Sequence, residues 1–201
     1  MSRDKDVEFM INYNKKYIFV RIPKTASTSI GKILSTKWMT HTKLSELKKM
    51  RDHHQYFIFC FVRNPWDRIY SAFEYLKQGG NSKSPWDIQA KLKMIDVVDG
   101  NFEEFIYKFV NKENSDFCNH VHFKLQLDWI GNSDYIDYIG KYENLNEDWK
   151  KISTIIGETK ILPKENISKN RKPYRNVYND KMVELVYDFY KKDILEFNYE
   201  F

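Results

Sequence analysis

The most apolar run of the chain, Tyr56–Val62, is the feature that most constrains its fold. It reads YFIFCFV and contains no charged residue. A run of this length, rich in aromatic side chains, is typical of a parallel strand buried on both faces. Arg63 ends the run, and Asn64 before Pro65 is a typical helix start, with a capping side chain followed by proline. The pattern predicts a central strand followed directly by a helix over Pro65–Leu76.

A second strand–turn–helix pattern lies nearer the start, in YIFVRIPKTASTSIGKI (17–33). Tyr17–Val20 predicts a buried strand, and Ile30 and Ile33 continue at helical spacing after the turn. Such a turn gathers unpaired backbone N–H groups and the positive end of a helix dipole, which together favour a phosphate group. The residues predicted to bind it are Lys24, Thr25, Ala26, Ser27, Thr28 and Ser29. The alternative is an ordinary Ser/Thr-capped helix beside a lysine. A Walker A loop is excluded, because no glycine precedes Lys24 within the motif.

Bulk composition narrows the class of protein. The length of 201 residues predicts one domain, 1–201, and the net charge of +5 suits an anionic ligand. No long basic run indicates nucleic acid, and no apolar segment is long enough to span a membrane. Cys60 and Cys118 form neither a disulfide framework nor a zinc spacing, so we expect a soluble, cytoplasmic protein. The oligomeric state is not predicted.

The remaining patterns predict an α/β fold, a single domain with a central, mostly parallel sheet flanked by helices. Residues 1–16 are expected to be a polar lead-in, and residues 78–99 an excursion over the active-site face that could carry acceptor specificity. The other predicted elements are a helix from near Thr42 or Lys43, a helix after a capping box of Asn101 and Glu104, a strand over Tyr135–Tyr142, a helix capped by Asn144 with Glu147 and closed by Gly157, and a last helix over Asp180–Leu195.

Two histidine patterns suggest chemical roles. His120 and His122 would share one face of a strand, which suggests metal ligands, but the sequence places no third ligand nearby, so no metal is predicted. His41 precedes the helix expected from Thr42. A lone histidine there is more often a surface or capping residue than a catalytic one.

Two motifs resemble those of a known family. PKTASTS (23–29) resembles the 5′-phosphosulfate loop of sulfotransferases that use 3′-phosphoadenosine 5′-phosphosulfate (PAPS), and its form is closest to the heparan 2-O and chondroitin/dermatan types. Many members carry glycine where this chain has Ser27, so a positive φ there would be strained. FVRNPWDRIYSAFEYL (61–76) resembles the 3′-phosphate motif, which implies that Arg63 and Ser71 bind the 3′-phosphate. The alternative for Arg63 is an ion pair with Asp67.

Weaker matches extend the resemblance to Phe201. The segment His41-Thr-x-x-x-x-Leu resembles the part of the family that carries the catalytic base, which implies that role for His41. HVHFKLQLDWI (120–130) resembles a motif containing Gln126, which implies substrate contacts for Gln126 and His122, with a scaffold role as the alternative. The basic loop Lys164–Arg175 matches one that closes over the nucleotide, or is simply solvated surface. Its implied nucleotide contacts are Lys169, Arg171, Lys172 and Tyr174.

The resemblance implies transfer of a sulfuryl group from PAPS to a hydroxyl of a carbohydrate acceptor. Lys24 would stabilise charge on the leaving phosphate, and His41 would accept the proton of the acceptor hydroxyl. Two alternatives remain open: a nucleotide-dependent phosphoryl transferase (kinase), and a non-catalytic binder of a phosphorylated or sulfated ligand.

Overall fold

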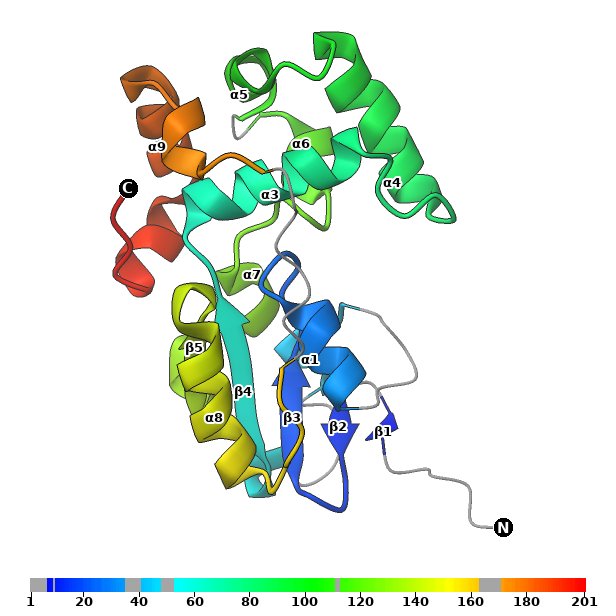
Figure 1. Cartoon of the computed structure of the whole chain (residues 1–201), viewed down its shortest axis with the longest axis vertical. Helices are drawn as coiled ribbons and strands as arrows, with labels where there is room; N and C mark the ends of the chain where they lie inside the picture. Colours follow the sequence, from blue (N-terminus) through cyan, green and yellow to red (C-terminus); the bar gives the residue numbers. More distant parts are fainter. Residues whose placement is uncertain (1–6, 9, 35–40, 48–52, 111–112, 163–170) are drawn as a thin grey trace. The chain divides into compact units, whose positions relative to one another are not determined.

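The computed structural model describes residues 7–8, 10–34, 41–47, 53–110, 113–162 and 171–201. The chain divides into two compact units, each built from two segments. Unit 1 comprises residues 1–63 and 126–169, and unit 2 comprises residues 64–125 and 170–201. The sheet belongs to unit 1, and unit 2 is helical in its described residues (Figure 1).

Unit 1 contains a five-stranded sheet in its described residues, with the strands in chain order (Figure 1). The strands are β1 (Val7–Glu8), β2 (Ile11–Asn12), β3 (Tyr17–Val20), β4 (Phe57–Val62) and β5 (Tyr138–Lys141). The pairings β3–β4 and β4–β5 are parallel, with Val20 opposite Cys60 and Val62 opposite Lys141. The prediction of parallel strands is therefore confirmed for the three longest strands. Their carboxyl ends share one edge of the sheet, where α/β proteins bind ligands.

The expectation of a polar lead-in over residues 1–16 is wrong for its described residues, 7–8 and 10–16. The short strands β1 and β2 form an antiparallel extension of the sheet, and Ile11 pairs with Ile18. Met10 and Ile11 are buried. Two-residue strands are too short to show the alternating pattern on which a sequence-based assignment depends, so this hairpin has no clear sequence signature.

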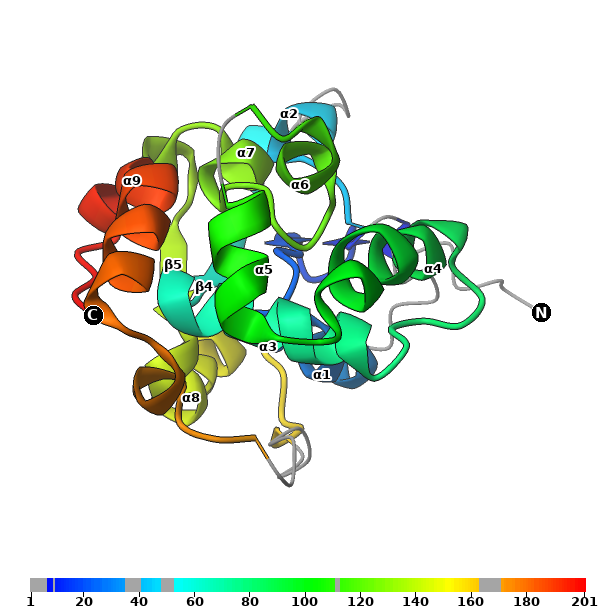
Figure 2. The same ribbon diagram turned by 90° about the horizontal axis from the view of Figure 1, so that it is seen from above.

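Helices cover both faces of the sheet in unit 1. On one face, α1 (Ser27–Ile33) and α8 (Leu145–Ile155) pack against Tyr17, Phe19, Phe59 and Phe61 (Figures 1 and 2). Each such fully buried side chain stabilises the fold by about 1.5–3 kcal/mol. The opposite face is covered by α2 (Leu44–Leu47) and α7 (Leu127–Ile130) (Figure 2). The predicted arrangement of helices around a central sheet is confirmed in this unit.

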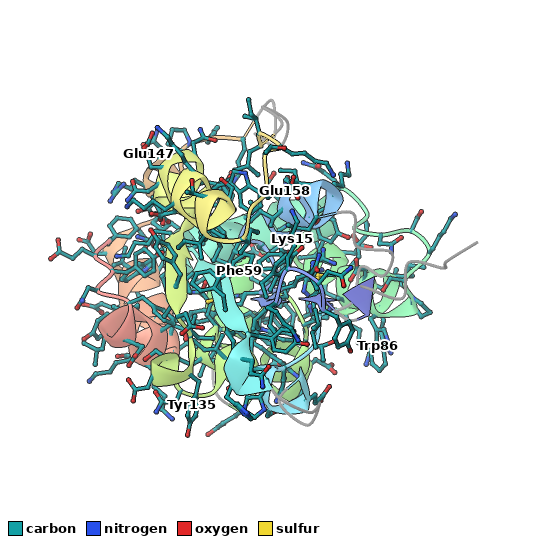
Figure 3. The ribbon with its side chains drawn as sticks, turned by 90° about the horizontal axis from the view of Figure 1, so that it is seen from below. Lys15, Phe59, Trp86, Tyr135, Glu147 and Glu158 are labelled. Atoms are coloured by element: carbon teal, nitrogen blue, oxygen red, sulfur yellow. The ribbon has the colours of Figure 1, made fainter. Side chains whose placement is uncertain are left out.

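The end of α8 is tied to the hairpin between β2 and β3. Gly157 follows the helix at φ 63°, which confirms its predicted closing role. The Lys15 Nζ atom donates to the Gly157 carbonyl at 2.8 Å and lies 3.3 Å from the Glu158 carboxylate (Figure 3). Lys15 lies at the amino-terminal edge of β3, opposite the edge where the predicted site lies.

Unit 2 is organised around a cluster of aromatic side chains. Phe105 contacts Phe73, Phe117 and Phe123 at ring-centroid distances of 5.1, 6.0 and 5.4 Å, and Tyr190 donates its hydroxyl to the Phe123 carbonyl at 2.6 Å. The helices of this unit are α3 (Pro65–Lys77), α4 (Pro85–Ala90), α5 (Phe102–Phe109), α6 (Ser115–Asn119) and α9 (Asp180–Glu196), with helical turns at Lys91–Ile95, Asp96–Val98 and Tyr174–Val177.

The capping predictions have mixed outcomes. Asn101 caps α5 as expected, because its side chain accepts from the Glu103 and Glu104 amides. Asn144 precedes α8, but its side chain makes no capping hydrogen bond, so that prediction is wrong. A short helical turn, Tyr142–Asn144, leads directly into α8 and replaces the expected cap. The excursion over 78–99 is itself largely helical. Its first helix, α4, begins where the Ser84 side chain caps it and Pro85 occupies the first helical position.

The strand expected around His120 and His122 is also absent from the described structure; these residues follow α6 in a turn. Leu44–Leu47 matches the helix expected from Thr42 or Lys43, and residues 48–51 of that expectation lie outside the described residues. Within the part of the chain that the structure describes, no helix is both long and apolar enough to cross a membrane.

Candidate functional site at the carboxyl ends of the parallel strands

The turn between β3 and α1 contains two left-handed residues. Lys24 has φ 69° and Ala26 has φ 64°, whereas Ser27 is the first residue of α1. Ser27, where a positive φ would have been strained, is therefore helical. The strained backbone conformations belong to Lys24 and Ala26 instead. A left-handed conformation costs an L-residue about 1–2 kcal/mol. Strain of this kind is concentrated at functional sites, where the surrounding structure maintains it.

The hydroxyl groups of this turn differ in their surroundings. Thr25 is fully buried and donates its hydroxyl to the Ile22 carbonyl at 2.9 Å. That bond uses the only proton of the Thr25 hydroxyl and tightens the turn. Ser27 and Ser29 are buried within the first turn of α1, and Thr28 is exposed.

Arg63 joins the predicted phosphate loop to the neighbouring strand. It directly follows β4 and is buried, with an exposed fraction of 4%. Its Nη1 atom donates to the Lys24 carbonyl at 3.1 Å, and its guanidinium carbon lies 3.8 Å from the centre of the Tyr142 ring. Lys24, Arg63 and Tyr142 follow β3, β4 and β5 respectively, so the ends of three parallel strands meet around one guanidinium group.

The backbone of Arg63 is held by Gln126. The Arg63 amide donates to Gln126 Oε1 at 2.8 Å, and Gln126 Nε2 donates to the Arg63 carbonyl at 2.9 Å. Gln126 is fully buried. The side-chain amide of Gln126 thus bonds both the N–H and the carbonyl of Arg63, as a neighbouring strand would, and so fixes the Arg63 backbone. The geometry therefore favours the scaffold alternative for Gln126.

His41 lies beside the same turn. Its Nδ1 atom is 2.8 Å from the Arg21 carbonyl oxygen, and Arg21 is the residue that follows β3. The Trp129 ring packs on the imidazole, with ring centroids 5.7 Å apart and an interplanar angle of 57°. Burial lowers the pKa of the Arg21 guanidinium to about 10, which still leaves it charged at neutral pH. Lys24, Arg63 and His41 therefore all belong to one edge of unit 1.

The other predicted nucleotide contacts belong to unit 2. Arg171 makes an ion pair with the Asp67 carboxylate, and its guanidinium carbon lies 4.6 Å from the centre of the Tyr70 ring. Asp67, the alternative partner considered for Arg63, thus has a partner within its own unit. Ser71 lies in α3 and is partly exposed.

Two further residues of that set follow Arg171 in the chain. Lys172 is exposed, and Tyr174 begins a helical turn in which its ring contacts Phe201 with centroids 5.7 Å apart. Lys169, the remaining predicted contact, lies outside the described residues.

His122 belongs to a buried polar cluster in unit 2. Its Nε2 atom lies 3.5 Å from Asp87 Oδ1, while Asp87 Oδ2 accepts from the Tyr75 hydroxyl and the Asn81 amide, both at 2.9 Å. Burial by itself would raise the pKa of Asp87, but the hydrogen bonds from His122, Asn81 and Tyr75 hold it well below its usual value. Burial lowers the pKa of the neighbouring His120. This cluster ties the start of the 78–99 excursion to α3, which favours a scaffold role for His122.

The structure adds two site residues that the sequence did not indicate. Tyr142 supplies the ring beneath Arg63, and Trp129 supplies the ring against His41. A signal for Tyr142 was present, because it is the last residue of the strand predicted over Tyr135–Tyr142, and in the structure it directly follows β5. Trp129 carried no such signal. Among the described residues, no group of three or more His, Cys, Asp or Glu side chains is arranged to hold a metal ion.

An α/β unit with lysine, arginine and histidine gathered where its parallel strands end has the charges that an anion-binding site for group transfer requires. The chain belongs to the sulfotransferase family: the model of that family matches residues 7–200. An uncharacterized protein from Archaeoglobus fulgidus is 33% identical to it over 129 residues, which cover 64% of this chain and 83% of that protein. No solved structure matches the chain. Sulfuryl transfer is the activity that membership of this family indicates.

Proposed function

We propose that this sulfotransferase takes its sulfuryl group from PAPS, on a P-loop-like β3–α1 turn, and transfers it to a hydroxyl of a carbohydrate. The hydrogen bond from Arg63 to the Lys24 carbonyl is the observation that carries the proposal. It joins residues of two separate motifs, one matched to the 5′-phosphosulfate and the other to the 3′-phosphate. Both phosphates belong to one nucleotide, so their binding residues have to lie close together.

The charges of the site suit this reaction. Sulfuryl transfer, like phosphoryl transfer, depends mainly on positioning and on stabilising charge in the transition state. Lys24 and the backbone amides of the turn would stabilise the negative charge that develops on the leaving 5′-phosphate. Arg63, fixed by Gln126 and Tyr142, would hold the 3′-phosphate as a preorganised donor fork.

His41 would act as the general base. As the acceptor oxygen forms its bond to sulfur, the bond between sulfur and the phosphate oxygen breaks, and His41 takes the proton of the acceptor hydroxyl. Adenosine 3′,5′-bisphosphate leaves with the electron pair of the broken bond. The further nucleotide contacts that we propose are Arg171, Lys169, Lys172, Ser71 and Tyr174.

A product assay tests the proposal. The full chain is incubated with PAPS and a panel of glycosaminoglycan-type oligosaccharides, and both the bisphosphate and the sulfated sugar are quantified. The wild type is expected to form the two products in equal amounts and the His41→Asn variant to form neither at a comparable rate. Binding of the bisphosphate without sulfation of any hydroxyl acceptor in the panel would favour the non-catalytic binder. Transfer of phosphate to an acceptor of the panel in a parallel incubation with ATP and magnesium in place of PAPS would favour a kinase.

A further inference from the structure

We propose that the β3–α1 turn itself orients the catalytic base. The Arg21 carbonyl holds neutral His41 as the tautomer that carries its proton on Nδ1, so that Nε2 is the atom that takes the acceptor's proton. Trp129 fixes the plane of the imidazole ring. The catalytic part of this inference rests on the proposed function, whereas the tautomer is a property of the folded chain alone.

The tautomer follows from the identity of the bonding partner. A backbone carbonyl oxygen can only accept a hydrogen bond, so an imidazole nitrogen 2.8 Å from it has to be the donor. In neutral histidine only one ring nitrogen carries a proton, and the other has the lone pair that accepts one. Nδ1 of His41 therefore carries the proton, and Nε2 is the basic atom.

The Arg21 carbonyl is a rigid acceptor, because backbone structure sets its direction on both sides. Val20, the preceding residue, is the last residue of β3 and pairs in register with Cys60 of β4. The following residue, Ile22, is fully buried, and its carbonyl accepts from the Thr25 hydroxyl. The acceptor that orients the base is thus part of the same turn that is proposed to bind the donor phosphate.

Trp129 holds the imidazole from α7. Its side chain has an exposed fraction of 5%, and its ring lies against His41 at 5.7 Å between centroids. Within the described residues the indole N–H makes no hydrogen bond, so its contribution at His41 is packing. The Trp129 amide donates to the Gln126 carbonyl at 3.1 Å. One helical turn, residues 126–129, therefore positions both Arg63, through Gln126, and His41, through Trp129.

The tautomer can be measured directly by long-range ¹H–¹⁵N correlation on the labelled full chain, under mildly alkaline conditions in which histidine is neutral. The His41 signals among the five histidines are identified by their loss in His41→Asn. A protonated-type shift for Nδ1 and an unprotonated-type shift for Nε2 are expected. The opposite pair of shifts would overturn the proposal, whether or not the protein transfers sulfate.

Two Trp129 variants test the positioning role. Trp129→Leu removes the ring, and we expect kcat to fall about 10- to 100-fold, as small misplacements of a reacting group do. The dissociation constant of adenosine 3′,5′-bisphosphate, measured by calorimetry, should stay unchanged. Trp129→Phe retains an aromatic ring and should recover most of the lost kcat. The matched control is Ile130→Val, which trims the adjacent buried side chain of α7 and should leave kcat unchanged.

The outcomes separate this inference from the proposed function. If Trp129→Leu lowers donor affinity and kcat together while Trp129→Phe recovers neither, Trp129 is merely structural and the positioning role is overturned. If the bisphosphate does not bind the wild type at all, the proposed function fails, and the Nδ1–H tautomer in the same sample would still support the orientation of His41 by the turn.

Discussion

Two strand-to-helix turns follow the neighbouring strands β3 and β4, and they begin their helices in opposite ways. After β4, the Asn64 side chain accepts from the Trp66 amide at 3.1 Å, and Pro65 occupies the first helical position. After β3, the capping position is held by Ala26 in a left-handed conformation, and alanine has no side-chain oxygen to offer. The β4–α3 turn satisfies its own helix start, whereas the β3–α1 turn does not do so with its capping side chain.

The difference assigns different tasks to the two turns. The β4–α3 turn supplies one side chain, Arg63, from a backbone held by Gln126. The β3–α1 turn supplies backbone groups: the Lys24 carbonyl to Arg63 and the Arg21 carbonyl to His41. Changes at the base held by the β3–α1 turn are therefore expected to alter chemistry, whereas changes in the β4–α3 turn are expected to alter either donor affinity or stability, depending on the residue.

The largest effect is expected at His41. Replacing it by asparagine removes the proposed base but retains an amide that can donate to the Arg21 carbonyl, so kcat should fall by about 10²- to 10⁴-fold. The dissociation constant of adenosine 3′,5′-bisphosphate, measured by calorimetry, should be unchanged. His54→Asn is the matched control, because His54 is exposed and precedes β4 at the other edge of the sheet. Weakened bisphosphate binding with full turnover at saturating PAPS would contradict the base assignment.

Arg63→Ala should have the next largest effect, now on donor affinity. Loss of the charged fork is expected to weaken bisphosphate binding by about 10- to 100-fold, which is about 1.4–2.8 kcal/mol. Lys15→Ala removes the same charge from the opposite edge of unit 1 and should leave the affinity unchanged. Equal losses in the two variants would mean that net charge, rather than the position of Arg63, determines binding.

Asn64→Ala should separate stability from donor affinity. The variant loses the cap of α3 and the hydrogen bond from Asn64 Nδ2 to the Glu200 carbonyl at 2.8 Å. We expect the free energy of unfolding in urea to fall by about 1–2 kcal/mol, with donor affinity retained in the folded protein. A loss of affinity as large as that of Arg63→Ala would remove the distinction between capping and binding at this turn.

The smallest effect is expected from Ala26→Gly. Glycine adopts φ 64° without the steric cost that alanine incurs, although it loses more backbone entropy on folding. The free energy of unfolding should therefore rise by about 1 kcal/mol or less. A clear loss of stability in the urea titration would show that Ala26 is not strained in the folded chain.

The sequence predicted the parts of the fold that depend on long apolar runs. Tyr17–Val20 and Tyr56–Val62 are β3 and, within one residue, β4, since buried parallel strands read as continuous apolar segments. The hairpin of β1 and β2 and the helical content of 78–99 were not predicted, because short elements depend on tertiary pairing rather than on their own periodicity.

The candidate site likewise contains residues that the sequence predicted and contacts that it did not. Lys24 and Arg63 could be found because each follows a recognisable strand and precedes a helix. Three contacts depend instead on how segments distant in the chain are aligned. They are the hydrogen bond from Arg63 to the Lys24 carbonyl, the Tyr142 ring against Arg63, and the Trp129 ring against His41. No local sequence pattern encodes that alignment. The Asn144 cap failed for a related reason: a helical turn before α8 removes the extended conformation that a capping residue adopts.

The most direct test of the donor site is a thermal melt of the full chain with adenosine 3′,5′-bisphosphate, compared with ADP and magnesium. A ligand at about a hundredfold its dissociation constant adds about 2.7 kcal/mol to the free energy of unfolding. We predict a clear rise in Tm with the bisphosphate alone, and a smaller rise in Arg63→Ala. A rise with ADP and magnesium only, or no rise with either ligand, would contradict a PAPS site at the end of β3.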